Sequence, residues 1–305
     1  MCPSRSEQRE SGLKFLHKCE LQLLGVSSLL AGYKNTGWRS QTVQALPLQP
    51  TIMDRWRGRV ALVTGASAGI GAAICRRLVE AGMVVVGAAR AVERIESLSR
   101  ELELEGKAGT LVGVKCDLNQ DADIENLFKE IKKRYNGVDV CINNAAMSYN
   151  DGLLEGTPER WREMLNVNIV ALCHCTKESV KSMQERGVND GHIIHLSSIL
   201  GHGVGIITGG YFYSCTKHAV KALTDGLRQE LRDMKSNIRI SSISPGYVET
   251  EFLGRMMGEE VANQMKTKFP ALTADDVAAS VCHILAAPPH VQIHDLIIKP
   301  NGESV

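Results

Sequence analysis

The chain has 305 residues, of which 44% are hydrophobic and 23% charged, and its formal net charge is +1. This balance excludes a chain that is disordered throughout, a collagen-like fibre and a protein with a broad basic face for nucleic acid. No apolar run approaches the roughly 18 residues that a membrane-spanning helix needs.

Residues 1–52 differ in charge from the rest of the chain. They hold six Lys or Arg and three Glu, against 29 basic and 31 acidic residues in the remaining 253. The glutamates argue against a mitochondrial presequence, and the long polar lead argues against a signal peptide. We expect a poorly ordered N-terminal extension over residues 1–52 and one domain over 53–305. A targeting role, or an alternative start at Met53, stays open.

From residue 59 onward, strands and helices alternate. Strands are predicted at residues 59–65, 83–90, 110–118, 138–145, 192–198, 238–246 and 295–300. Helices are predicted at residues 69–82, 92–105, 122–135, 160–186, 213–235 and 274–286. The strands are apolar along their whole length, as a parallel sheet covered on both faces requires. The pattern predicts an α/β fold, a Rossmann-like doubly wound parallel sheet of about seven strands with helices on both faces.

The first strand runs into the first helix through a glycine-rich turn, in which residues 64–71 read TGASAGIG. A pyrophosphate needs backbone N–H groups at a helix N-terminus with no side chains in the way, and glycines provide this. The turn therefore predicts dinucleotide binding, with a purely structural turn as the alternative. The predicted contacts in this turn are Gly65, Ser67, Gly69, Ile70 and Gly71.

The end of the second strand indicates which dinucleotide is bound. NAD-binding sheets usually carry an acid there, which holds the ribose 2′-hydroxyl. Here residues 88–91 read AARA, and the first acid after them is Glu93. Because a guanidinium pairs with a 2′-phosphate, Arg90 predicts NADP(H). The alternative is that Arg90 is only a solvated strand end.

Tyr213 and Lys217 open a predicted helix four positions apart, so they lie on one helical face. A free phenol has a pKa of about 10, which is too high for acid–base work at neutral pH. A cation about 4 Å away supplies about 4 kcal/mol at an effective dielectric near 20, enough to lower that pKa to about 7. The pair predicts a tyrosine general acid/base, although Tyr213 could equally be a core residue.

Other polar residues accompany this pair. Ser198 and Asn144 follow predicted strands, where ligands of such sheets bind, and Asn168 lies inside a predicted helix, where a buried amide is costly without a partner. The ordered motifs TGASAGIG, CDL, NNA, the helix Asn, the strand-end Ser, YSCTK and SPGYVET resemble the single-domain short-chain dehydrogenase/reductase family over residues 57–300.

The resemblance assigns roles to matching positions. It implies that Tyr213 transfers the proton, that Lys217 lowers its pKa and holds the ribose hydroxyls, and that Ser198 binds the substrate oxygen. Asn168 would hold a water in a proton relay. Further cofactor contacts implied are Asp117, Leu118, Asn144, Pro245, Gly246, Val248 and Thr250. Three departures are Ala146 in place of a family Gly, a long Ser198-to-Tyr213 spacing, and Ala68 where many NADP enzymes carry a basic residue.

Within the family, the segments MDRWRGRVALVTGASAGIGAA, VDVCINNA, DDVAASV and VQIHDLIIKP resemble a group that includes insect NADP-dependent farnesol dehydrogenases. The predicted substrate contacts are Met147, Ser198, His202, Tyr213 and Tyr247. The segments 201–210 and 247–270 would form apolar walls, with Ile206, Ile207, Phe252, Leu253, Met256 and Met257. Met256 and Met257 could equally be ordinary helix packing. An apolar pocket favours an isoprenoid alcohol such as farnesol, or a ketosteroid, over a sugar.

The function predicted is NADP(H)-dependent hydride transfer between an alcohol and a carbonyl. The alternative is a catalytically idle NADP(H)-binding redox sensor or interaction module. The resemblance also implies a homodimer or homotetramer built through the helices at 160–186 and 213–235. Nine cysteines without a CxxC pair favour free thiols in a reducing compartment, so we expect a cytoplasmic protein. Cys173-His174-Cys175 lacks a second ligand pair, and we expect no metal there.

Overall fold

A computed structural model of the chain describes residues 53–204 and 209–302. The predictions made for residues 1–52, and those for Ile206 and Ile207, lie outside the described residues. The described chain begins with the 3-10 turn η1 (Asp54–Trp56). Its Trp56 is fully buried and donates from Nε1 to the carbonyl oxygen of Leu285 at 2.8 Å, which ties the start of the described chain to the helix that ends at Ala286.

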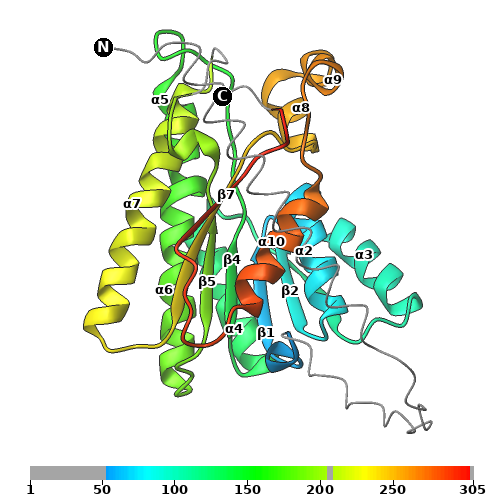
Figure 1. Ribbon diagram of the computed structural model, residues 1–305, viewed down its shortest axis with the longest axis vertical. Coiled ribbons are helices and arrows are strands. Elements are labelled where there is room, and N and C mark those ends of the chain that lie inside the picture. The colour runs from blue at the N-terminus through cyan, green and yellow to red at the C-terminus, as the bar shows by residue number, and fades with distance from the viewer. Residues whose placement is uncertain (1–52, 205–208, 303–305) are drawn as a thin grey trace, which may run out of the picture. The chain divides into compact units, whose positions relative to one another are not determined.

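The described residues form a seven-stranded sheet with the order β3-β2-β1-β4-β5-β6-β7 (Figure 1). Its strands are β1 (Val60–Thr64), β2 (Val84–Ala89), β3 (Thr110–Lys115), β4 (Val140–Asn143), β5 (His192–Leu196), β6 (Arg239–Pro245) and β7 (Asp295–Ile298). Every neighbouring pair is parallel. The predicted Rossmann-like fold is confirmed, and the strand order reverses between β1 and β4, where such sheets bind ligands.

Helices cover both faces of the sheet (Figure 1). One face carries α2 (Gly69–Glu80), α3 (Val92–Leu104) and α10 (Ala274–Ala286), and the other carries α4 (Asp121–Tyr135), α6 (Ala171–Glu185) and α7 (Tyr211–Asp233). Alternate residues of β1 enter opposite cores, Ala61 and Val63 on the first face and Val60 and Leu62 on the second. Burial on both faces explains why these strands are apolar throughout.

Two segments differ from the sequence-based expectation. The helix predicted over 160–186 is interrupted, because α5 (Pro158–Leu165) passes through a π-helical turn, η2 (Asn166–Val170), before α6. The wall segment 247–270, expected to be irregular, contains α8 (Glu251–Met257) and α9 (Glu259–Lys268). No residue of α8 is fully buried. Figure 1 shows both helices beyond the carboxyl ends of the strands.

Within the described ranges, no helix combines the length and the hydropathy needed to cross a bilayer. The seven cysteines that the structure describes are free thiols, and burial raises the pKa of several of them, to about 12 for Cys116 and Cys141. Within residues 53–204 and 209–302, no group of three or more His, Cys, Asp or Glu side chains could hold a metal ion.

Two histidines of β5 are buried in the sheet. His192 Nε2 lies 2.9 Å from Ser241 Oγ, and both ring nitrogens of His195 have hydroxyl partners. Burial lowers the pKa of each to about 3, with Arg55 acting on His192 and Lys217 and Arg228 acting on His195 in the same direction. Both rings are therefore neutral at physiological pH.

We expect the free energy of unfolding to fall as pH drops below 6.5, the ordinary pKa of histidine. Below that pH the unfolded chain binds protons at these two positions and the folded chain does not, at a cost of up to about 1.4 kcal/mol per histidine per pH unit. Above it both states are neutral and the histidines contribute no slope. Urea unfolding at about pH 7.5, 6 and 5 should show a smaller loss in His192→Asn and in His195→Asn than in the wild type. Equal losses would show that the rings titrate normally.

Candidate active site

The turn between β1 and α2 is too tight for side chains at its glycines. Gly65 and Gly69 have φ of 67° and 52°, values that favour glycine. A Cβ on Gly71 would collide with the carbonyl oxygen of Gly65 and lie 2.7 Å from Asn144 Nδ2. Ala68, the N-cap of α2, offers no side-chain acceptor, so the first N–H groups of the helix stay available to an anion. Ser67 and Ile70 flank this cradle, half-buried.

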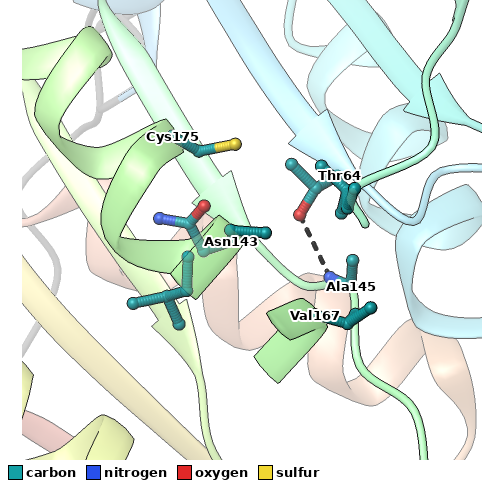
Figure 2. Close-up of a pocket in the computed structure, with 8 residues that line it drawn as sticks. Thr64, Asn143, Ala145, Val167 and Cys175 are labelled. Atoms are coloured by element: carbon teal, nitrogen blue, oxygen red, sulfur yellow. Dashed lines mark hydrogen bonds between the residues drawn. The ribbon is translucent and has the colours of Figure 1, made fainter. Parts of the chain in front are cut away.

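Side chains lock β4 to this turn. Asn144 Nδ2 donates to the carbonyl oxygens of Thr64 at 2.9 Å and Gly65 at 3.3 Å. Thr64 Oγ1 accepts from the N–H groups of Asn144 and Ala145, each at 3.1 Å, and Figure 2 shows the second bond. Beneath it lies a small pocket into which Asn143 and Cys175 project from β4 and α6 (Figure 2). Hydrogen bonds therefore connect the ends of β1 and β4 at the point where the strand order reverses.

Ala146, which replaces a family glycine, is tolerated for a simple reason. Among the described residues, only Asn136 and Lys235 combine a side chain with a positive φ. Ala146 therefore has a backbone conformation that is ordinary for alanine, and the loop after β4 needs no glycine there.

The ends of β2 and β3 lie side by side, since Ala89 pairs with Lys115. Arg90 follows β2, is exposed, and makes no ion pair with any other described residue. Asp117 follows β3, and its Oδ1 accepts from the N–H of Asn119 at 3.1 Å. Leu118 packs against the α4, α6 and α7 core. This edge thus presents one unpaired guanidinium beside an ordered carboxylate turn.

Tyr213 and Lys217 are brought together on α7. Lys217 Nζ lies 5.5 Å from the centroid of the Tyr213 ring and donates to the carbonyl oxygen of Leu196 at 2.7 Å. The two residues are only 9% and 3% exposed. Burial raises the pKa of Tyr213 above its usual value and lowers that of Lys217 to about 8.

The direction of the Tyr213 pKa corrects the pairwise expectation from the sequence. That expectation counted the attraction between a cation and a phenolate but omitted the cost of taking the phenolate out of water. Within this chain the desolvation cost is larger. In the chain alone, burial therefore raises the pKa of Tyr213.

The two serines after β5 have different environments. Ser197 is buried, and its Oγ donates to the backbone carbonyl oxygen of Lys217 at 3.3 Å. Ser198 is half-buried and caps the 3-10 turn η3 (Ile199–Gly201), where its Oγ accepts from the N–H of Leu200 at 3.1 Å. No described residue accepts a hydrogen bond from Ser198, so its hydroxyl proton is free to be donated to a ligand.

Asn168 lies in the π-helical turn and is 1% exposed. Its Oδ1 accepts from the N–H of Met147 at 2.9 Å, and its Nδ2 donates to the Met147 carbonyl oxygen at 2.9 Å and to Thr216 Oγ1 at 3.1 Å. A π turn re-aims side chains within a helix, which explains how this amide reaches both partners. Asn168 therefore joins the loop after β4 to α7, one residue before Lys217.

The predicted cofactor residues after β6 are held by backbone bonds. Pro245 ends the strand, and the N–H of Gly246 donates to the Ile298 carbonyl oxygen of β7 at 2.7 Å. Val248 forms an isolated parallel bridge with Leu272. Thr250 caps α8, and its methyl group lies against Gly69, where an added Cβ would sit 3.2 Å away. The start of α8 thus faces the glycine turn.

Two aromatic contacts lie at and beside Tyr213. Phe252 of α8 packs against its ring at a centroid distance of 5.7 Å. Phe212, its neighbour on α7, stacks on Trp161 of α5 at 5.5 Å. Tyr247 is half-buried and lies four residues before the start of α8.

His202 points toward β6 and β7. Its Nε2 lies 2.9 Å from Ser244 Oγ and 3.4 Å from Asp295 Oδ2, and its Nδ1 lies 3.1 Å from Lys221 Nζ. Both ring nitrogens therefore have protein partners. The predicted contact between His202 and substrate would have to compete with these bonds.

Comparison with known proteins agrees with this geometry. A family model described as short chain dehydrogenase matches residues 59–260. The chain is 50% identical over 253 residues to dehydrogenase/reductase SDR family member 11 of Gallus gallus, covering 82% of this chain and 99% of that protein. It is 44% identical to farnesol dehydrogenase of Aedes aegypti, over 82% of this chain and 99% of that protein.

Among solved structures, the alcohol dehydrogenase of the archaeon Thermococcus sibiricus complexed with 5-hydroxy-NADP superposes with a TM-score of 0.68 at 29% identity. That match covers 79% of this chain and 96% of the other. The resemblance inferred from the ordered motifs is confirmed: the chain belongs to the short-chain dehydrogenase family of oxidoreductases.

Proposed function

We propose that the protein is an NADP(H)-dependent oxidoreductase that interconverts an alcohol and a carbonyl group on an apolar substrate, with Tyr213 as general acid/base. The observation that carries this proposal is the buried Tyr213–Lys217 pair on α7. Consumption of NADPH with an apolar carbonyl, lost in Tyr213→Phe, tests the proposal.

The residues present fit NADP(H). The turn from Gly65 to Gly71 forms a cradle that a Cβ would fill, suited to a pyrophosphate. Arg90, exposed and without an ion-pair partner among the described residues, would hold the 2′-phosphate. Lys217 would hold the ribose hydroxyls. The Thermococcus sibiricus relative, whose complex contains 5-hydroxy-NADP, supports the choice of a phosphorylated dinucleotide. When bound, the nicotinamide supplies or accepts the hydride.

The chain's own groups would move the proton and orient the substrate. Ser198 Oγ would donate to the substrate oxygen, and Tyr213 Oη would give a proton to that oxygen in reduction and take it back in oxidation. Because burial lowers the pKa of Lys217 to about 8, its charge varies near neutral pH. The positive charge of an oxidised nicotinamide would add to that of Lys217 and offset the burial that raises the pKa of Tyr213. Asn168 would hold a water that relays the proton onward.

The substrate is proposed to be a farnesol-like isoprenoid alcohol or a ketosteroid. Phe252 against Tyr213, with Tyr247 and Met147 half-buried on adjoining loops, gives the reacting group apolar surroundings that exclude water. The relative named farnesol dehydrogenase supports the isoprenoid class.

We further propose a homodimer or homotetramer in the cytoplasm. Leu165 of α5 and Val170 of η2 are 39% and 48% exposed, and such apolar positions on a helical face suit contact with a second copy. The free thiols suit a reducing compartment.

Cofactor choice is testable at the end of β2. Ala89→Asp combined with Arg90→Ala replaces a 2′-phosphate partner by an acid that repels the phosphate and accepts from a 2′-hydroxyl. We expect the ratio of kcat/KM for NADP over NAD to fall at least about 100-fold, since charged hydrogen bonds contribute about 1.5–3 kcal/mol each. The matched control is Arg100→Ala, an exposed arginine of α3, which should leave the ratio unchanged. An unaltered ratio in the double variant would remove Arg90 from cofactor selection.

A further inference from the structure

A chain of buried polar side chains runs from β4 to α7 beside the candidate active site. Asn143 Nδ2 donates to Thr176 Oγ1 of α6 at 2.9 Å, and Thr176 Oγ1 lies 3.1 Å from His195 Nε2 of β5. His195 Nδ1 lies 2.8 Å from Thr224 Oγ1 of α7. All four residues are buried, His195 and Thr224 to 1% exposure. Four separate elements of the fold therefore meet through one imidazole ring.

The hydrogen-bond directions in this chain are fixed. Thr224 Oγ1 donates to the Val220 carbonyl oxygen at 2.7 Å, so it must accept from the N–H at His195 Nδ1. The Nε2 of a neutral ring then accepts from Thr176, whose hydroxyl in turn accepts from Asn143. Each hydrogen bond in this chain thus holds one hydrogen. A second ring proton would sit on His195 Nε2 and point at the Thr176 hydroxyl hydrogen, so that two donors would face each other.

The surroundings keep the ring neutral. The charged groups that act on His195 are Lys217 and Arg228, both on α7, and the partners from β4 and α6 are uncharged. Together with burial, these cations lower the pKa of His195 to about 3. The ring thus keeps one tautomer across the pH range in which the enzyme would work.

Every element that this chain joins carries part of the candidate active site. The carbonyl oxygen of Leu196, the residue after His195, accepts from Lys217 Nζ at 2.7 Å. Thr224 lies two helical turns beyond Lys217 on α7. Asn143 precedes Asn144, which binds the glycine turn. The ring therefore fixes the height of α7 over β5 at the point where Lys217 reaches the strand.

We propose that His195 is a positioning residue, whose neutral ring holds α7 against β5 and α6. Because Leu196 of β5 holds Lys217 Nζ while the Tyr213 ring moves with α7, this contact sets the position of Lys217 Nζ relative to Tyr213. The proposal rests on the proposed roles of Tyr213 and Lys217. A small movement matters, because a cation that retreats from about 4 to about 5 Å at an effective dielectric near 20 raises the pKa of the phenol by about 0.6.

The test is the pH dependence of kcat for alcohol oxidation by the full chain with NADP⁺. In His195→Leu and in Thr224→Val, we expect the rising limb to move at least about 0.5 pH unit toward alkaline pH. At neutral pH kcat should fall several-fold. Thr224→Ser keeps the hydroxyl and should restore the wild-type profile, which a purely volume-filling role would not require.

The control is His192→Asn, because His192 is an equally buried histidine of the same strand that binds Ser241 of β6 instead. It should lower stability without moving the profile. A wild-type pH profile in folded His195→Leu, or an equal shift in His192→Asn, would overturn the proposal. If His195→Leu does not fold, Thr224→Val and Thr224→Ser provide the test: an unmoved profile in Thr224→Val, or a profile in Thr224→Ser that is shifted as far as in Thr224→Val, would overturn it. Full activity in Tyr213→Phe would overturn the proposed function as well, whereas loss there with unmoved Thr224→Val would overturn the positioning role alone.

Discussion

Tyr213→Phe is expected to lower kcat by about 10²- to 10⁴-fold, the contribution of a positioned acid–base group and equal to about 3–5 kcal/mol. The substitution removes the phenolic oxygen and leaves the ring that packs on Phe252 at 5.7 Å. The fold and the cofactor cradle are therefore preserved, and NADPH affinity should stay within about twofold.

The measurement combines turnover, followed by NADPH absorbance, with a fluorescence titration of NADPH. Tyr211→Phe provides the matched control, since Tyr211 lies two residues earlier on the same helix and is only half-buried. It should change kcat by less than about twofold. If Tyr213→Phe keeps more than about a tenth of the wild-type rate, Tyr213 is not the proton donor.

Gly71→Ala is expected to weaken NADPH binding by about 10- to 100-fold. The added Cβ would collide with the carbonyl oxygen of Gly65 and come within 2.7 Å of Asn144 Nδ2, so the turn must open. Opening it moves the N–H groups that would bind the pyrophosphate, and overpacking of this kind also costs about 1–3 kcal/mol of stability.

Gly226→Ala is the control that separates an effect on the glycine turn from a general effect of replacing a glycine by alanine. Gly226 lies inside α7, and a Cβ there meets nothing within 4 Å. This variant should be more stable by about 1 kcal/mol, with NADPH affinity unchanged. Wild-type affinity in Gly71→Ala, measured by the same titration, would show that the turn does not hold the cofactor.

Much of the fold could be predicted from the sequence because both sheet faces are covered. Fully buried strands appear as short apolar runs, and α2 shows its buried stripe at Ile74 and Leu78. The π turn at Asn168 was not predictable, because one extra residue in a turn leaves no compositional trace. α8 was not predicted because its 7 residues make less than two helical turns, too few for a helical period to stand out in the sequence.

The residues of the candidate site were likewise predictable only in part. Motif spacing brought Tyr213, Lys217 and Ser198 into the prediction, and the structure places them on adjoining elements at one edge of the sheet. Their roles, and those of the other predicted site residues, remain proposals. His195 was invisible to motif reasoning because its partners Thr176 and Thr224 are remote in sequence. Its one sequence indication was a polar ring inside the apolar run HIIHL.

NADP(H)-dependent hydride transfer that requires Tyr213 can be tested in one assay. NADPH absorbance is followed for the full chain and for Tyr213→Phe with farnesal, a ketosteroid and a polar sugar aldehyde, beside NADH. We expect the wild type to oxidise NADPH faster than NADH, with an apolar carbonyl and not with the sugar aldehyde. Tyr213→Phe should not oxidise NADPH with either carbonyl. NADPH that binds but is not consumed with any apolar carbonyl, or consumption that persists in Tyr213→Phe, would contradict it.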